Sequence, residues 1–339
     1  MDLLDDRKKK ILQAIVDEYI HTAEPVSSST IAKEYGLDFS SATIRNEMAE
    51  LEHIGLIEKT HTSSGRVPSP LGYRYYVNEL IKDDNISMEE IVYIKSKLET
   101  KVNEIEELTK IATHTISEVT HYPTVAIGPD MTQQIIEDIK FVLLGNRVMM
   151  AIIITDANLI KETIIKFDED INQKQVENLN VIFNTKLKGK QLEKITIPFE
   201  EYIWEEAKYS IAVIKQIIDE LNRVIEEETR IYLEGTNKAF EFPEFKNVDL
   251  AKKFVNVIDT KELMLEMLNN GIANDINVYI GNESTHDELK DFSIVTFKHQ
   301  VDNKDIGTIG IIGPKRMDYS KVISVMKFIS KKLNERDDK

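Results

Sequence analysis

The sequence predicts an α+β protein with more than one domain. The chain has 339 residues, and a single hydrophobic core rarely grows beyond roughly 250 residues, so two or three domains are expected. Apolar residues recur at helical spacing through the N-terminal part. Further along, strand-like runs stand on both sides of a block of helical patterns. That order is typical of one α+β domain that contains an insertion.

The composition is that of a soluble globular protein. Hydrophobic residues make up 42% and charged residues 30% of the chain, and no apolar run approaches the roughly 20 residues that span a bilayer. The first residues resemble neither a secretory signal nor a transit peptide, so we expect a cytoplasmic protein. The chain has no cysteine, which excludes disulfides, thiol nucleophiles and thiolate zinc sites.

Negative charge is concentrated away from the N-terminus. The net charge of −16 argues against a generic polyanion binder, because such proteins usually present a broadly positive surface. Residues 1–82 carry only −3, which leaves −13 for the rest of the chain. A local nucleic-acid surface in the first 82 residues is therefore compatible with the composition.

Three helices are predicted before residue 56. The first follows a basic run at residues 7–10 and has one apolar face, made of Ile11, Leu12, Ile15, Val16, Tyr19 and Ile20. Ser27 can cap a second helix that ends at Gly36, and Ser40 can cap a third that continues to Gly55. Two helices joined by a tight turn form a helix-turn-helix, so the third helix is the candidate reading helix.

The exposed face of this third helix carries the strongest functional signal. Ile44, Met48 and Leu51 share one side of the helical wheel, while the opposite side holds Ala42, Arg45, Asn46, Ala49 and His53. Small alanines beside Arg45 and Asn46 leave room to enter a groove about 12 Å wide, where arginine suits guanine and asparagine suits adenine. The alternative is a plain surface helix. The candidate DNA contacts on this helix are Ser41, Ala42, Thr43, Arg45, Asn46 and Ala49.

A small hairpin is predicted after the reading helix. Residues 56–59 and 66–68 can pair as strands around THTSSG, whose glycine and hydroxyl residues favour a turn. A helix-turn-helix with such a ribbon is a winged helix, although a merely structural hairpin is the alternative. Arg66 can contact phosphate or enter a minor groove, and Arg74 on the next helix is expected to stay free for the DNA backbone. The other candidate phosphate contacts are His61, Ser63, Ser64 and the Gly65 amide.

The remaining chain is predicted as a linking helix and a mixed domain. Apolar residues step by three or four from residue 91 to 119, which predicts one long helix that packs on its own domain or on a second copy. The strand-like runs VAIG, IKFVLLG, VMMAIIIT and LIKETIIKF are expected to form one antiparallel sheet, which INVYIG, FSIVTFKHQ and IGTIGIIG resume before a last helix at 319–333. An apolar stripe from Ile211 to Ile225 is either core or a dimer face.

Several stretches resemble one known family. ATIRNEMAELE, HTSSGRVPS with GYRYYV, YLEGT, and GTIGIIGPKRMDYSKVI are similar to the bacterial heat-inducible transcription repressor HrcA, and they spread over nearly the whole chain. The resemblance implies a dimeric repressor that binds an inverted-repeat operator upstream of chaperone operons, with the GroE chaperonin helping to keep it active. It also implies a GAF-like domain and an inserted dimerising domain.

The expected domains combine this resemblance with the patterns above. They are a winged-helix domain at 1–82, a linking helix at 83–122, a GAF-like domain at 123–169 plus 236–339, and an inserted dimerising domain at 170–235. A dimer can place two third helices in successive major grooves of a palindrome. The alternative function is a regulator whose GAF-like domain senses a small molecule and whose DNA binding is the output.

No catalytic, metal or cofactor site is predicted. GTIGIIGPKR combines three glycines with Lys315 and Arg316, but it lacks the order and spacing of a phosphate-binding P-loop. The seven histidines include no metal-binding pair at helical spacing, and no nucleophile elbow or dinucleotide fingerprint is present. We therefore expect a protein that is not an enzyme.

Overall fold

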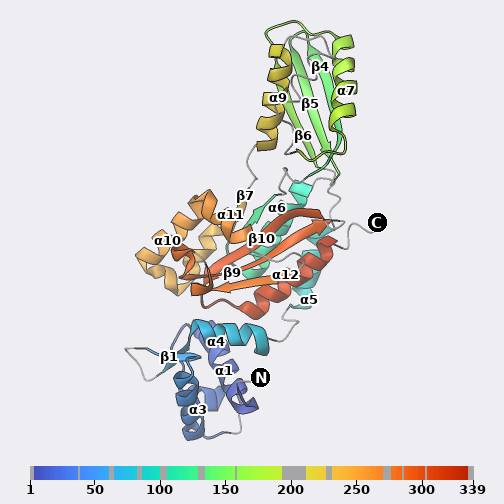
Figure 1. The fold of residues 1–339 in the computed structure, drawn as a ribbon. Helices are drawn as coiled ribbons and strands as arrows, with labels where there is room; N and C mark the ends of the chain where they lie inside the picture. Colours follow the sequence, from blue (N-terminus) through green and yellow to red (C-terminus); the bar gives the residue numbers. More distant parts are fainter. Residues whose placement is uncertain are drawn as a thin grey trace.

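The computed structural model describes residues 4–36, 39–60, 65–81, 86–99, 105–128, 134–156, 159–192, 211–226, 231–269, 276–284, 286–301 and 304–334. Three lobes follow one another along its long axis (Figure 1). The N-terminal helices form one end, a five-stranded sheet with helices on both faces forms the middle, and a three-stranded sheet with two helices forms the other end. We call the middle part the sheet domain and the far end the inserted lobe.

The N-terminal lobe is a winged helix. Its elements are α1 (Asp6–Thr22), α2 (Ser28–Glu34), α3 (Ser41–His53), β1 (Ile57–Lys59), β2 (Arg66–Pro68), α4 (Pro70–Tyr75) and the π-helical turn η1 (Tyr76–Leu80). The predicted caps are confirmed, because the Ser27 and Ser40 side chains accept hydrogen bonds from the backbone N–H groups of Thr30 and Thr43. β1 and β2 pair as an antiparallel hairpin directly after α3.

The sheet domain is built on five antiparallel strands, in the order β7-β3-β10-β9-β8. Their bounds are β3 (Thr124–Ile127), β7 (Ile231–Glu234), β8 (Ile276–Ile280), β9 (Phe292–Val301) and β10 (Lys304–Pro314). β10 is central because it pairs with β9 along most of its length and with β3 on its other side. Strands from distant parts of the sequence therefore share one sheet.

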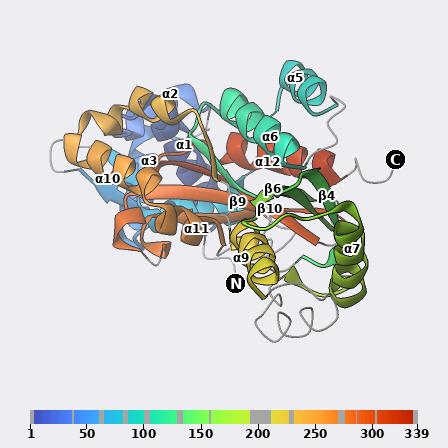
Figure 2. The ribbon, with the colours of Figure 1, turned by 90° about the horizontal axis from the view of Figure 1, so that it is seen from above.

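Helices cover both faces of this sheet (Figure 2). One face carries α5 (Met88–Leu98), α6 (Ile105–Thr120) and α12 (Tyr319–Asn334), and the other carries α10 (Val248–Asp259), α11 (Lys261–Asn269) and the short turns η4 (Thr236–Glu241), η5 (Pro243–Lys246), η6 (Gly281–Glu283) and η7 (Asp287–Leu289). Side chains along β9 alternate between the two faces of the sheet. Val295 and Phe297 are buried under α5, α6 and α12, while Phe292 and Ile294 are buried on the opposite face.

The prediction of one long linking helix is wrong. α5 ends at Leu98, and α6, which begins at Ile105, packs back against it. Ile94 and Leu98 of α5 and Ile116 of α6 are buried in the same core as α12. The apolar stripe is therefore covered within the chain, by a helical hairpin that the sheet domain holds.

The predicted limits of the insertion are also wrong. β4 (Ile136–Gly145), β5 (Val148–Thr155) and β6 (Ile160–Lys166) form a separate sheet with α7 (Gln173–Leu187) and α9 (Ile211–Glu226), whereas β3 and β7 belong to the sheet domain. The inserted lobe thus takes in strands that had been assigned to the larger domain, and the expectation of one continuous sheet fails. The stripe on α9 is core, since Ile214, Ile217 and Leu221 are buried in this lobe. The GAF-like relationship of the sheet domain stays a prediction.

Candidate nucleic-acid interface

The candidate reading helix α3 presents the predicted face to solvent. Ile44, Met48 and Leu51 are buried against the rest of the winged helix, whereas Ala42, Arg45, Asn46, Ala49 and His53 are exposed, as is Glu50. Ser41 and Thr43 are half-buried at the start of the helix. α3 lies at the end of the molecule farthest from the inserted lobe (Figure 1). This exposed face has the size and the chemistry for base edges in a major groove.

Charged residues of α1 hold the inner side of α3. Glu47 is 9% exposed, and its carboxylate oxygens lie 3.1 Å from Arg7 Nη1 and 3.2 Å from Lys8 Nζ. Lys8 also contacts Glu50 at 3.0 Å and Asp5 at 3.1 Å, and the hydrogen bonds to these carboxylates raise the pKa of its ammonium group. The basic run at the N-terminus thus neutralises carboxylates on the reading helix. The sequence carried no signal for this pairing, because Lys8 and Glu47 lie 39 positions apart in the chain.

The wing is closed by tight packing at its base. β1 and β2 pair from Ile57 with Pro68 to Lys59 with Arg66. Gly65 is buried, and a Cβ atom on it would lie 2.7 Å from the backbone of Pro25. Close packing against Pro25 therefore requires glycine here, and the structure does not present Gly65 as an open phosphate contact. The candidate residues His61, Ser63 and Ser64 lie outside the described residues.

Arg66 ties the wing to the reading helix. Its Nε and Nη2 atoms lie 2.9 Å and 2.7 Å from Glu52 Oε2 on the last turn of α3. Its backbone exchanges two hydrogen bonds with Val26, of 2.8 Å and 2.9 Å. Arg66 is thus held by Glu52, and its position is explained by the fold of the wing.

The expectation that Arg74 stays free for DNA is wrong in this structure. Arg74 Nε donates to Glu283 Oε1 at 2.8 Å, and its Nη2 atom donates to the Val278 carbonyl oxygen at 2.6 Å and to the second oxygen of Glu283. Both partners belong to the sheet domain. Arg74 therefore connects the winged helix to the sheet domain. No local sequence pattern could have shown this contact, because Glu283 lies 209 residues away.

The glycine-rich segment near the C-terminus is also structural in the described chain. It forms β10, which ends at Pro314 as predicted, and Arg316 is 8% exposed and paired with Glu244. The Asp318 side chain accepts from the Lys321 backbone N–H at 3.0 Å, as expected for the cap of α12. Among the residues that the structure describes, no group of three or more His, Asp or Glu side chains is arranged to hold a metal ion.

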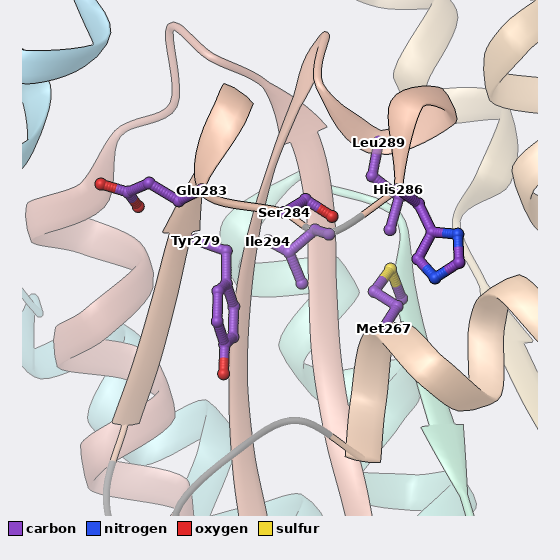
Figure 3. A pocket seen from close by; sticks show the side chains of 7 residues that line it. All are labelled: Met267, Tyr279, Glu283, Ser284, His286, Leu289 and Ile294. Atoms are coloured by element: carbon purple, nitrogen blue, oxygen red, sulfur yellow. The ribbon is translucent and has the colours of Figure 1, made fainter.

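One pocket of about 190 Å³ opens beside β8 and α11 (Figure 3). It is lined by Met267, Tyr279, Glu283, Ser284, His286, Leu289 and Ile294. Glu283 already binds Arg74, and the His286 ring contacts Glu266. This volume is below the roughly 300 Å³ at which small-molecule sites begin.

Two family models together cover most of the chain. One, described as the HrcA protein C terminal domain, matches residues 106–323, and another, described as the winged helix-turn-helix transcription repressor HrcA DNA-binding domain, matches residues 3–78. The chain belongs to the HrcA family of heat-inducible transcription repressors. It is accordingly a transcription repressor with a DNA-binding winged helix, and a regulator rather than an enzyme.

Full-length relatives and a solved structure agree with this HrcA assignment. The heat-inducible transcription repressor HrcA of Ruminiclostridium cellulolyticum is 41% identical, over 98% of this chain and 97% of its own. That of Clostridium acetobutylicum is 39% identical, over 99% and 98%. A crystal structure described as that of a hypothetical protein superposes with a TM-score of 0.66 at 22% identity, over 98% of each chain, so the fold is shared. None of the described helices is long and apolar enough to cross a membrane.

Proposed function

We propose that this repressor acts in the cytoplasm as a homodimer that reads an inverted-repeat operator of chaperone operons. Each copy inserts α3 into one of two successive major grooves. The observation that supports this most is the exposed face of α3, where Arg45 and Asn46 stand between Ala42 and Ala49. Arg45 suits a guanine and Asn46 an adenine, while Ser41 and Thr43 at the helix start suit the flanking phosphates.

The outer face of the inserted lobe supports the dimer. α7 and α9 cover one face of the β4-β5-β6 sheet, and the opposite face carries apolar side chains that nothing in the described chain covers. Its exposed members are Val142, Leu144, Ile160 and Ile164, with exposed fractions of 40%, 50%, 63% and 53%. Val142, Met150 and Ile164 form one row across the three strands. A contiguous apolar surface of this kind is typical of a protein interface.

The closed edge of β4 and the charges on this face support a second copy as its partner. The free edge of β4 is closed, because Asn180 and Asn184 of α7 bond to the backbone N–H and C=O groups of Phe141 and Ile139 at 2.5–3.0 Å. Pairing by that edge is thereby blocked. On this face Lys140 and Glu162 flank Ile152 in one row. A two-fold axis along β5 would set Lys140 of one copy opposite Glu162 of the other.

Substitution of Arg45 tests the reading helix. Arg45→Ala should cost roughly 1 to 3 kcal/mol of binding free energy on the operator and relax the preference at one base pair, because a bidentate contact to guanine is lost. The operator is first located by footprinting the promoter regions of the genome, and affinities for it and for random DNA are then compared by fluorescence anisotropy.

Lys33→Ala is the matched control, since it removes an exposed positive charge from α2 of the same domain. It should change the affinities for operator and random DNA by the same small factor. Equal losses on both DNAs for Arg45→Ala would contradict the assignment of α3 as the base-reading element.

Control by the GroE chaperonin completes the proposal. It is supported by the family resemblance and is tested by measuring operator binding of the purified protein with and without chaperonin; equal binding in the two cases would contradict it. The alternative, control by a small molecule, gains no support from the pocket in Figure 3, which is small and in which Glu283 and His286 already have partners.

A further inference from the structure

The winged helix is joined to the sheet domain by two arginines that point in opposite directions. Arg74 leaves α4 and binds Glu283 and the Val278 carbonyl oxygen of the sheet domain. Arg316 leaves the turn before α12 and donates to the Ile20 carbonyl oxygen in α1, while Glu244 holds its other nitrogens at 2.6 Å and 3.2 Å. Each domain thus supplies one cation and one backbone acceptor, and we call these contacts the interdomain joint.

The joint is well shielded and its geometry is restrictive. The side chains of Arg74, Glu283 and Arg316 are 25%, 35% and 9% exposed. The Tyr73 ring of α4 packs on the fully buried ring of Tyr319 in α12, with the ring centroids 5.6 Å apart. Bidentate arginine–carboxylate pairs fix angle as well as distance, so the joint restricts rotation of one domain on the other.

A continuous series of contacts leads from the joint to the reading helix. Arg316 binds the carbonyl oxygen of Ile20 near the C-terminal end of α1, and Arg7 and Lys8 at the other end of α1 hold Glu47 on the buried side of α3. α1 therefore carries the orientation of the sheet domain to α3. The tilt of α3 relative to the sheet domain and the inserted lobe depends on the joint.

We propose that Arg74 and Glu283 are positioning residues for DNA binding, and that they set the spacing at which the two reading helices of a dimer meet their half-sites. This rests on the dimeric reading proposed above. A rigid joint makes affinity depend strongly on half-site separation, because an inserted half turn of about 5 base pairs moves the second half-site to the opposite side of the duplex. A loosened joint lets each winged helix turn independently, which reduces that dependence.

The test compares a series of DNA duplexes. They carry the two half-sites at natural separation, at separations changed in single base-pair steps up to about half a helical turn, and one half-site alone. For the protein with its natural residues we expect at least about a 100-fold loss of affinity at a half turn, and less than about a 10-fold loss for Arg74→Ala and for Glu283→Gln. Affinity for the single half-site should stay within about 3-fold for both variants.

Two further variants separate the joint from other effects. The exchange Arg74→Glu with Glu283→Arg should restore part of the dependence on separation that either change alone removes. Lys253→Ala breaks an ion pair with Asp291 within the sheet domain and should leave the dependence unchanged. If Arg74 were instead a phosphate contact, Arg74→Ala would weaken binding to every duplex alike, while Glu283→Gln, which releases Arg74, would strengthen it.

The possible outcomes decide between the proposals. Unchanged dependence on separation in Arg74→Ala, or a uniform loss on all duplexes including the single half-site, overturns the joint as a spacing device. If the protein with its natural residues already binds all separations equally, dimeric reading of an inverted repeat is itself wrong, and the spacing role of the joint fails with it. Loss of binding by Arg74→Ala with an unchanged melting temperature and no recovery in the exchanged variant also counts against the joint.

Discussion

Two tyrosines at the interdomain joint have different surroundings although their rings are neighbours. The Tyr319 hydroxyl donates to the Lys315 carbonyl oxygen at 2.7 Å and lies 2.6 Å from Ser293 Oγ. The Tyr73 hydroxyl is buried without a hydrogen-bond partner among the described residues. A buried polar group without a partner costs stability, whereas a paired one contributes to it.

This difference predicts opposite results for the same substitution. Tyr319→Phe should lower the free energy of unfolding by about 1 to 2 kcal/mol, because the Lys315 carbonyl loses its donor. Tyr73→Phe should leave the stability unchanged or raise it by up to about 1 kcal/mol, since the ring packing stays and the unpaired hydroxyl is removed. Calorimetric melting of the two variants makes the comparison, and a clear loss of stability in Tyr73→Phe would show that this hydroxyl has a partner.

His299 makes the stability of the sheet domain depend on pH. It lies on β9 with 2% exposure, and neither ring nitrogen has a hydrogen-bond partner among the described residues. Burial lowers the pKa of the imidazole from 6.5 to about 4. Between these two values the unfolded chain binds a proton that the folded chain does not, so this contribution to stability is complete above about pH 7 and is lost as the pH falls toward 4.

The expected size follows from the shift of the pKa. Between pH 7 and pH 5, His299 should account for about 2 kcal/mol of lost stability, and His299→Leu should lack this part of the pH dependence. Chemical denaturation at the two pH values gives the difference, and His53→Leu, on the exposed face of α3, serves as the control. An equal pH dependence in the His299→Leu variant and the unsubstituted protein would mean that the imidazole is already hydrated in the folded state.

At the scale of elements, the open sheet face of the inserted lobe predicts how the chain assembles. Ile164→Lys should raise the dissociation constant of the dimer at least about 100-fold, because two lysines would be buried without partners in a two-fold interface. The melting temperature of the monomer should hardly change, since Ile164 is 53% exposed. Sedimentation equilibrium measures the dissociation constant.

Val181→Lys is the matched control on the other side of the inserted lobe. Val181 lies on α7 and is 66% exposed, so the same kind of substitution there should leave the dimer intact. A dimer that persists in Ile164→Lys and dissociates in Val181→Lys would place the interface on the helical side of the lobe.

Local sequence patterns predicted most of the individual elements. The reading helix, its Ser40 cap and its exposed face were predictable because helical period and capping act within one or two turns. α12 begins at Tyr319 as expected, because Asp318 caps it just beyond Pro314. In contrast, the strand patterns of β3 and β4 gave no indication that β3 pairs with β10 while β4 pairs with β5. Pairing partners depend on residues far along the chain.

At the scale of the whole molecule, the proposed reading helix and the proposed dimer face lie far apart. The winged helix and the inserted lobe lie at opposite ends, and the sheet domain stands between them (Figure 1). The negative charge outside residues 1–82 is therefore carried mainly by parts of the chain away from the reading helix. Such a distribution disfavours non-specific contact between the rest of the protein and DNA. The interdomain joint connects the sheet domain to the winged helix that carries α3.

The sequence by itself determined the winged helix, the composition of the reading face and membership of the HrcA family. The first two depend on residues that are close together in the chain, and the third on motifs that are spread along nearly all of it. Only the tertiary structure decided the roles of Arg66 and Arg74. Both read as arginines available for phosphate, and the carboxylates that bind them, Glu52 and Glu283, lie 14 and 209 residues away. An arginine binds whichever acceptor the fold brings within reach, and folding, not sequence proximity, brings these acceptors there.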